Sequence, residues 1–550
     1  MKIGITMSGG GYRAAAYSLG ALSYMNFIES GGKSLLKQVK ALSTVSGGSI
    51  TGISYAQSAK QDEDFHYYFQ RLYVFLTEED LVNEGICNFV NPESKNSLIE
   101  GFAAVYNEKL FNNKKFESIL PKKGENGEYD THLEFTCINA TEFNTGTPFR
   151  FIAQTAELRH RIGNHFYKLD KQLIESMPLG IPLAASSCFP GGFEPVSVDI
   201  SPYVKAASVI QRYEKNTIVS LMDGGIVDNQ GIDSVLLYDN QRKQNEMLDL
   251  IMVVDVSSPN ISGYEPSKEK RIPVIGNTSM IKIYRFIWMT NILLVGMLFI
   301  RHIQENKAAL ITISVLLTLF ILATLLLSYA KRLIKKTANT NEVGIGKINR
   351  MNVLTPNAVA ELFANRVNSV GLLVGSVFMK HLRRKNYQNL FGSREHIHKC
   401  FMTAIYQLKH AEPEDKMVNL SRISFYELGI NEPTDLIRNI CTSASKMKTT
   451  LWVPLNSQGK EKIRDVITAG QITTCANFIV YYHKICNSLQ QIEKRKQDNQ
   501  STESDLFYEP RLQRQKQLFA DIDKQARKHW SKFLINPWWM FDELVVSNRK

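Results

Sequence analysis

Short apolar runs that end in small residues mark the first part of the chain. Residues 2–7 have the pattern of a short buried strand, and residues 14–27 place apolar side chains at helical spacing. Further apolar runs over residues 39–45 and 218–222 also predict strands. All three predicted strands are followed closely by glycine-rich turns.

The middle of the chain differs because it contains long apolar runs. Residues 308–330 carry no charged side chain over about the 20 residues that a helix needs to cross a bilayer. Residues 286–300 form a shorter run, which Arg285 and Arg301 can extend by reaching towards lipid headgroups. We expect a transmembrane hairpin with helices at about 283–300 and 308–330; a buried core helix is the alternative for each run.

The charges around this hairpin predict its orientation. Lys and Arg occupy positions 268, 270, 271, 282 and 285 before it and positions 331, 332, 335 and 336 after it. The connecting loop, residues 301–307, holds only Arg301 and Lys307. By the positive-inside rule, both flanks of the hairpin face the cytoplasm.

The last part of the chain is mostly helical in pattern. Residues 353–410 predict amphipathic helices, and we expect a strand at Thr450–Pro454. A polar stretch after residue 488 predicts a linker that leads to a charged helix. Trp538, Trp539 and Phe541 follow this helix, and they fit a membrane interface, the docking of a partner, or packing onto the catalytic domain.

Composition narrows the class of protein. The 550 residues are 44% hydrophobic and 21% charged, which is enough for two or three structural units. Seven single cysteines without metal-ligand spacing favour a reducing compartment, and no secretory signal is visible. The net charge of +12 favours an anionic lipid surface, because we find no nucleic-acid-binding motif.

The first glycine-rich turn, Ser8-Gly9-Gly10-Gly11-Tyr12-Arg13, lies between a predicted strand and a helix, where backbone amides can bind an anion. It lacks the Lys-Ser/Thr pair of a phosphate-binding Walker loop. Gly9, Gly11 and Ala14 satisfy a dinucleotide-binding pattern, but the next predicted strand lacks the acidic residue at its end. Neither nucleotide site is therefore favoured.

The second turn, Thr44-Val45-Ser46-Gly47-Gly48, has the small residues of a nucleophile elbow, although Thr44 replaces the usual first glycine. A serine that attacks an ester needs a base, and it needs amides that stabilise the oxyanion. The amides of Gly10 and Gly11, with Gly9 as a further candidate, can provide the oxyanion hole. No histidine lies in a comparable turn.

The third turn, Asp223-Gly224-Gly225, places a carboxylate directly after an apolar strand. Taken alone, Asp223 is either a turn residue or a catalytic group at the carboxyl edge of a parallel sheet. Asp228 and Asn229, which follow it, are expected to cap a helix.

Together, the three turns and their order resemble the patatin-like phospholipase family. Two further segments agree: TCINATEFNTGTPFRF at residues 136–151 and ASSCFPGGFEPV at residues 185–196. The resemblance covers about residues 1–258, and residues 448–482 resemble a closing part of the family domain. It implies a three-layer α/β/α sandwich with a mostly parallel central sheet, interrupted by the membrane hairpin and followed by a helical C-terminal part.

The resemblance also implies the chemistry. Ser46 is then the nucleophile, Asp223 its general base, and Gly9 to Gly11 the oxyanion hole, with no cofactor and no metal. Arg13 matches the family's basic residue, and it either orients the loop or lies near a lipid phosphate. The expected function is hydrolysis of glycerophospholipid acyl esters in the bilayer; a lipid acyltransferase and a non-catalytic membrane scaffold are the alternatives.

The expected domain organisation follows from these assignments. Residues 1–258 form the catalytic core and residues 259–345 the hairpin insertion. Residues 346–485 continue the catalytic domain as helices, and residues 486–550 form a charged linker and a C-terminal helix with an aromatic end. The bilayer is both substrate and anchor, the catalytic domain faces the cytoplasm, and the oligomeric state stays open.

Overall fold

The computed structural model describes residues 1–91, 97–204, 217–243, 246–257, 278–340, 355–412 and 423–546. The chain forms two compact units. One consists of residues 1–261 together with residues 375–550, and the other of residues 262–374. The first unit contains the predicted strands and turns, so it is described first.

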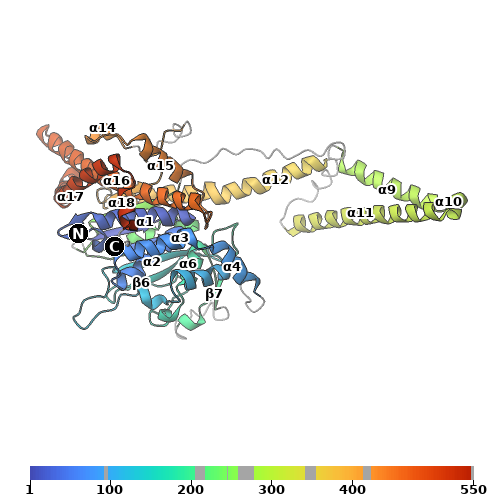
Figure 1. The fold of residues 1–550 in the computed structure, drawn as a ribbon, viewed down its shortest axis with the longest axis horizontal. Coiled ribbons are helices and arrows are strands. Elements are labelled where there is room, and N and C mark those ends of the chain that lie inside the picture. Colours follow the sequence, from blue (N-terminus) through green and yellow to red (C-terminus); the bar gives the residue numbers. More distant parts are fainter. Residues whose placement is uncertain are drawn as a thin grey trace. The chain divides into compact units, whose positions relative to one another are not determined.

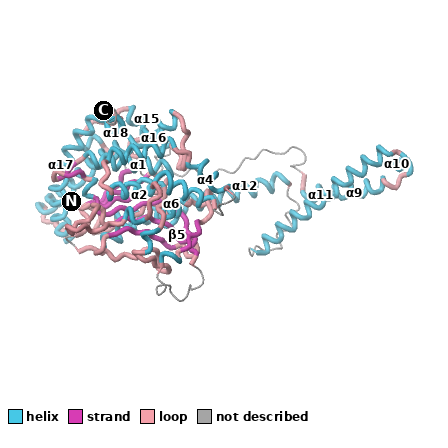
Figure 2. Tube along the Cα trace, turned by 60° about the horizontal axis from the view of Figure 1, so that its bottom comes forward, coloured by secondary structure: helices cyan, strands magenta, loops and turns pink. Residues whose placement is uncertain are grey.

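A mixed sheet forms the centre of the first unit (Figure 2). Among the described residues it has eight strands, in the order β10-β9-β1-β4-β5-β8-β7, with β6 also paired to β5. Neighbours from β10 to β5 are parallel, whereas β6 and β8 are both antiparallel to β5. The strands are β1 (Ile3–Met7), β4 (Val39–Val45), β5 (Phe135–Glu142), β6 (Thr147–Gln154), β7 (Val196–Asp199), β8 (Ile218–Asp223), β9 (Leu250–Asp255) and β10 (Cys400–Ala404). The expected α/β class with a mostly parallel sheet is confirmed.

Helices cover both faces of this sheet. Adjacent residues of a strand point to opposite faces. Thr44 of β4 contacts Gly52 of α2 (Gly47–Lys60), whereas Ser43 contacts Gly231 at the start of α8 (Ile232–Asn240). Helix α1 (Gly11–Phe27) packs on α2, and Figure 1 shows these helices beside the sheet.

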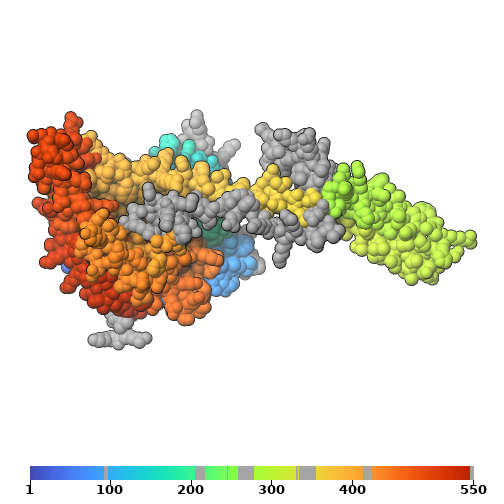
Figure 3. Space-filling model, turned by 90° about the horizontal axis from the view of Figure 1, so that it is seen from above, coloured from blue at the N-terminus to red at the C-terminus, as the bar shows by residue number. Residues whose placement is uncertain are grey.

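The C-terminal part completes this unit, since β10 extends the sheet and α16 (Ser457–Gln497) packs along α1. The two helices approach closely at glycines: a methyl group on Gly20 would lie 2.0 Å from the carbonyl oxygen of Ile467. Helix α17 (Glu503–Ile535) packs on α16, and the C-terminal residues form the orange-to-red surface in Figure 3.

Two local expectations for this part were wrong. Residues 450–454 are irregular, and the additional strand lies instead at β10, where our prediction had only helices. The expected linker is largely helical, because α16 continues to Gln497 and buries Leu489 and Ile492.

The aromatic end packs inward. Phe541 is 5% exposed and meets the rings of Phe69 and Tyr73, and Trp539 meets Phe27. Of the alternatives for these aromatic residues, the structure supports packing onto the protein for Trp539 and Phe541.

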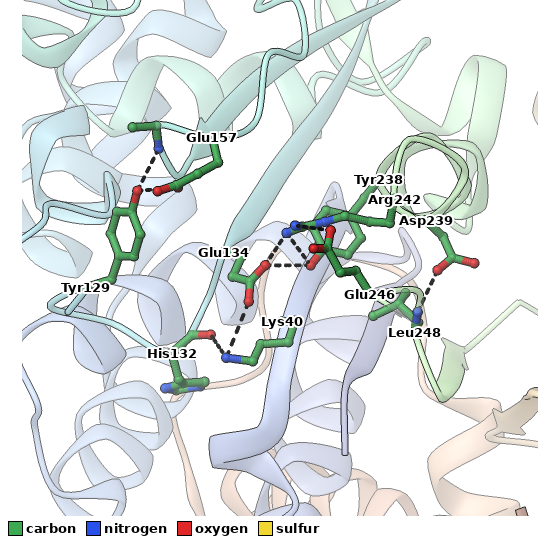
Figure 4. A network of polar contacts seen from close by, with 11 residues as sticks. Lys40, Tyr129, His132, Glu134, Glu157, Tyr238, Asp239, Arg242, Glu246 and Leu248 are labelled. Atoms are coloured by element: carbon green, nitrogen blue, oxygen red, sulfur yellow. Dashed lines mark hydrogen bonds and ion pairs between the residues drawn. The ribbon is translucent and has the colours of Figure 1, made fainter. Parts of the chain in front are cut away.

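A polar network fastens α8 to the sheet at the amino ends of β4 and β5 (Figure 4). Glu134, just before β5, pairs with Lys40 at 3.5 Å and with Arg242, and it accepts a 2.9 Å hydrogen bond from Tyr238. These contacts hold the end of the sheet that lies opposite the three glycine-rich turns.

The second unit is built from apolar helices. Helices α9 (Met280–Met297) and α11 (Lys307–Thr340) pack as a hairpin through α10 (Arg301–Glu305), and Asn291 of α9 donates a 3.0 Å hydrogen bond to Thr324 of α11. Among the described residues, three helices are long and apolar enough to cross a membrane: Met280–Met297, Lys307–Tyr329 and Pro356–Phe391. Their apolar side chains are largely exposed, which indicates membrane association. The third of these helices lies where we expected amphipathic helices.

Candidate active site

Ser46 occupies a strained turn between β4 and α2. Its backbone has φ 52° and ψ −122°, a conformation that non-glycine residues rarely adopt. Its amide donates a 2.9 Å hydrogen bond to the hydroxyl of Ser186, and its carbonyl accepts one from the amide of Ser49 at 2.8 Å. This is the backbone strain that a nucleophile elbow requires.

The glycines after Ser46 let two backbone segments touch. A methyl group on Gly47 would lie 2.0 Å from the carbonyl oxygen of Gly11, and one on Gly48 would lie 2.6 Å from that of Met7. Any side chain here would push the first turn away from the second. The two glycine-rich turns are therefore in direct backbone contact.

Asp223 ends β8 and lies beside Ser46. Its backbone amide donates to the carbonyl of Cys188 at 2.9 Å, and its carboxylate accepts the amide of Gly225 at 2.7 Å. Asp223 pairs with Ala140 of β5, and Val45, the residue before Ser46, pairs with the adjacent Asn139. The two side chains are well shielded, because Ser46 is 6% exposed and Asp223 is 5% exposed. The structure thus brings the two predicted residues together.

Burial changes the acidity of this carboxylate. Loss of solvent raises the pKa of Asp223 to about 6, although the hydrogen bonds from Gly225 and Ser46 act in the opposite direction. A carboxylate with a raised pKa is a better proton acceptor for a serine hydroxyl than an exposed aspartate. The environment therefore suits Asp223 to the role of a base.

The glycine loop lies against Ser46. A methyl group on Gly9 would lie 3.1 Å from Cβ of Ser46, but the Gly9 amide already donates to the carbonyl of Asn229 at 3.0 Å. In the part of the chain that the structure describes, the amides of Gly10 and Gly11 have no acceptor. Of the three expected oxyanion glycines, Gly10 and Gly11 are therefore the two whose amides have no partner among the described residues.

Arg13 contacts backbone carbonyls. Its guanidinium donates to Ser445 and Met447 at 3.1 and 2.7 Å and to Val256 at 3.1 Å. Burial lowers the pKa of Arg13 to about 10, which the nearby Asp255 partly offsets. These contacts favour the loop-orienting alternative over contact with a lipid phosphate.

Asp228 has the capping role that we expected. Its carboxylate accepts hydrogen bonds from the backbone amides of Gln230 at 3.2 Å and Asp233 at 2.8 Å. The second bond pairs a backbone amide in the first turn of α8 that has no acceptor within the helix. Asn229 instead donates to the hydroxyl of Ser257 at 2.9 Å.

Sequence reasoning missed several supporting residues. The hydroxyl of Ser186 forms 2.9 Å hydrogen bonds with the Ser46 amide and with the Ser49 hydroxyl. Residues 185–196 were part of the resemblance, but no role was predicted for Ser186. The carbonyl of Thr450 accepts the amide of Tyr12 at 2.8 Å, from a loop more than 400 positions away in the chain. Nothing in the local pattern marks such a distant contact.

No group of three or more His, Cys, Asp or Glu residues within the described ranges could hold a metal ion. The reactive groups that the described part of the site brings together are a serine, a carboxylate and backbone amides. This set of groups is suited to acyl transfer.

Comparison with known proteins identifies the class. Residues 5–236 match the family model described as patatin-like phospholipase. The chain therefore contains a patatin-like phospholipase domain, which belongs to a family of lipid acyl hydrolases. A search of the curated proteins finds no match. The family match ends before β9, β10 and the helices after them.

Proposed function

We propose that the protein hydrolyses fatty-acyl esters of glycerophospholipids through a dyad of Ser46 and Asp223. The observation that carries this proposal is the placement of a strained, buried serine beside a buried carboxylate whose pKa is raised. The family of lipid acyl hydrolases to which the domain belongs supports the substrate class.

In the first step of this mechanism, Ser46 becomes acylated. Asp223 accepts the proton of the Ser46 hydroxyl while Oγ attacks the ester carbonyl carbon. The amides of Gly10 and Gly11 donate hydrogen bonds to the oxyanion that forms. The intermediate then collapses: the proton on Asp223 passes to the leaving oxygen, and a lysophospholipid departs.

In the second step, water releases the fatty acid. Asp223 is again ionised and accepts a proton from a water molecule that attacks the acyl-enzyme carbonyl. The same amides stabilise the second oxyanion. When this intermediate collapses, the proton returns to Oγ of Ser46, the fatty acid leaves, and the enzyme is restored.

The second unit supports a location beside the substrate. The hairpin helices α9 and α11 would hold the protein at a bilayer, and the basic residues that flank the hairpin would keep the catalytic unit on the cytoplasmic side. The expected domain boundaries form part of this proposal, with one catalytic unit interrupted by an anchor.

Fatty-acid release from mixed phospholipid vesicles tests the proposal. The full chain is reconstituted alongside Ser46→Ala and Asp223→Asn. The matched controls are Ser531→Ala and Asp521→Asn on the exposed side of α17. We expect both dyad variants to lose activity by about a thousandfold or more and both controls to keep it. Full activity in either dyad variant, or an inactive wild-type protein, would contradict the proposal.

A further inference from the structure

Helix α13 (Met379–Phe391) lies outside the residues that match the family, yet it belongs to the same compact unit as the dyad. Its buried residues include Arg383 and Asn386, which are 7% and 5% exposed. Burying a guanidinium and an amide carries a free-energy cost unless both are bonded. Their partners therefore show what this helix holds in place.

Asn386 holds the segment that carries Asp223. Its Nδ2 donates to Oδ1 of Asp228 at 3.0 Å, across 158 positions in the chain. Asp228 ends the short helix α7 (Gly225–Asp228), whose first amide donates to the Asp223 carboxylate at 2.7 Å. Asn386 thus fixes the far end of the turn that positions Asp223.

Arg383 holds a second carboxylate near the site. It pairs with Asp255 at the end of β9 over 2.9 Å, and the hydroxyl of Tyr387 donates to the same carboxylate. Asp255 is fully buried. An unpaired charge at such a position is strongly unfavourable, so Asp255 depends on Arg383 of α13 for its opposite charge.

Hydrogen bonds connect Asp255 to the glycine loop. Its Oδ1 accepts the amide of Ser257 at 2.8 Å, and the Ser257 hydroxyl accepts Nδ2 of Asn229 at 2.9 Å. The carbonyl of Asn229 in turn accepts the amide of Gly9 at 3.0 Å. A continuous set of bonds therefore runs from α13 to the loop that precedes Gly10 and Gly11.

Met379, the first residue of α13, also reaches the Asp223 turn. A methyl group on Gly225 would lie 3.2 Å from Cε of Met379 and 2.9 Å from Oδ1 of Asp223. The same helix therefore covers the Asp223 turn and binds the carboxylates on either side of it.

We propose that Asn386 and Arg383 are positioning residues for the reaction, Asn386 acting on Asp223 through Asp228, and Arg383 acting on the oxyanion loop through Asp255. The inference rests on the proposed function. The proposal extends the residues needed for catalysis beyond the family-matched segment to helix α13, which follows the second unit in the chain. Catalysis then requires α13 as well as the three glycine-rich turns.

The test uses the full chain with a water-soluble p-nitrophenyl ester, so that vesicle binding does not enter the result. Asn386→Ala and Arg383→Gln are compared with Asn389→Ala and Arg384→Gln, two exposed residues of the same helix. Rates are divided by the number of sites that a fluorophosphonate labels at completion, which removes unfolded protein from the comparison. Arg383→Lys keeps the charge and serves as the conservative variant.

We expect kcat per labelled site to fall about tenfold or more in Asn386→Ala and Arg383→Gln, with KM nearly unchanged, because displaced reacting groups slow the chemical step. Labelling should slow in parallel. Arg383→Lys should recover part of kcat, and both controls should match the wild type. If Asn386→Ala does not fold, Asn386→Ser, whose side chain is too short to reach Asp228, gives the same measurement.

A lower melting temperature with unchanged kcat per labelled site would overturn this inference, because the two residues would then serve stability alone. Loss of kcat in the exposed controls would overturn it as well. Failure of the proposed function has a different signature, since Ser46→Ala would then hydrolyse the same ester as fast as the wild type.

Discussion

The backbone amide of Ser46 donates a 2.9 Å hydrogen bond to the hydroxyl of Ser186, which also lies 2.9 Å from the hydroxyl of Ser49. All three residues are buried. The strained turn at Ser46 is thus held by a side chain from α6 (Gly180–Ser187), and not by its own segment alone.

Ser186→Ala should weaken both folding and activity. Removing the hydroxyl leaves a buried amide without an acceptor, which costs about 1–3 kcal/mol in the free energy of unfolding. Urea unfolding measures this loss, and the rate of fluorophosphonate labelling reports on Ser46. Ser176→Ala, at an exposed serine, is the control; equal stability of the two variants would show that the Ser186 bond is unimportant.

The activity should have an acid limb near pH 6. Asp223 accepts a proton in the proposed mechanism, so it must be ionised, and burial raises its pKa to about 6. On a soluble ester, kcat/KM should therefore fall tenfold per pH unit well below this value. An activity that stays constant down to pH 4.5 would exclude Asp223 as the base.

The same pKa predicts how stability depends on pH. The pKa of Asp223 in the folded state lies above the unfolded value near 3.9, so the folded state binds more protons than the unfolded state between about pH 4 and 6. The contribution of Asp223 to the free energy of unfolding therefore falls as pH rises through this range. Asp223→Asn should therefore gain stability relative to the wild type as pH rises from 4 to 7. Urea unfolding at both pH values checks this, and a constant difference would contradict it.

Gly47→Ala should disrupt the site. Its methyl group would lie 2.0 Å from the carbonyl oxygen of Gly11, so the glycine loop would have to move. We expect the rate of Ser46 labelling to fall at least about a hundredfold, because a displacement of reacting groups by about 1 Å can slow a reaction by that factor. Gly371→Ala is the control, because a methyl group there meets no atom within 4 Å. Normal labelling of Gly47→Ala would refute the close backbone contact.

A charge in α11 should weaken membrane insertion. Leu322 lies within the apolar window of Lys307–Tyr329 and is 52% exposed. Arginine near the centre of a spanning helix costs about 2.5–3.5 kcal/mol. Leu322→Arg should therefore release more protein on alkaline carbonate extraction, whereas Leu322→Phe should behave as the wild type. Equal extraction of both variants would argue against insertion of this helix.

The three turns could be predicted because each is local. Small residues directly after a short apolar run specify a tight turn at a strand end, whichever partners the strand later takes. Ser46, Asp223 and the glycines were found in this way. The prediction that Asp223 lies at the edge of a parallel sheet was less accurate, because β8 is antiparallel to β5.

The direction of β8 explains how the two side chains meet. Val45 pairs with Asn139 in the parallel direction, and Asp223 pairs with Ala140, the next residue of β5, in the antiparallel direction. Strands β4 and β8 therefore approach each other end to end along the same side of β5. These strand pairs join residues that lie nearly a hundred positions apart in the chain. A local sequence pattern does not predict which distant strand a given strand pairs with.

The contributions of the C-terminal part were unpredictable for the same reason. Asn386 and Arg383 lie in a helix with many charged residues, and nothing in its pattern distinguishes them from the exposed Arg384. Only the folded structure shows that they meet Asp228 and Asp255.

Mass spectrometry of the fluorophosphonate-treated protein tests the central claim most directly. If Ser46 is the nucleophile, the wild type carries one adduct, on the peptide that contains Ser46, and loses fatty-acid release in proportion to labelling. Asp223→Asn should label much more slowly, and Ser46→Ala should not label. An adduct on another residue, or full fatty-acid release by fully labelled protein, would contradict the account.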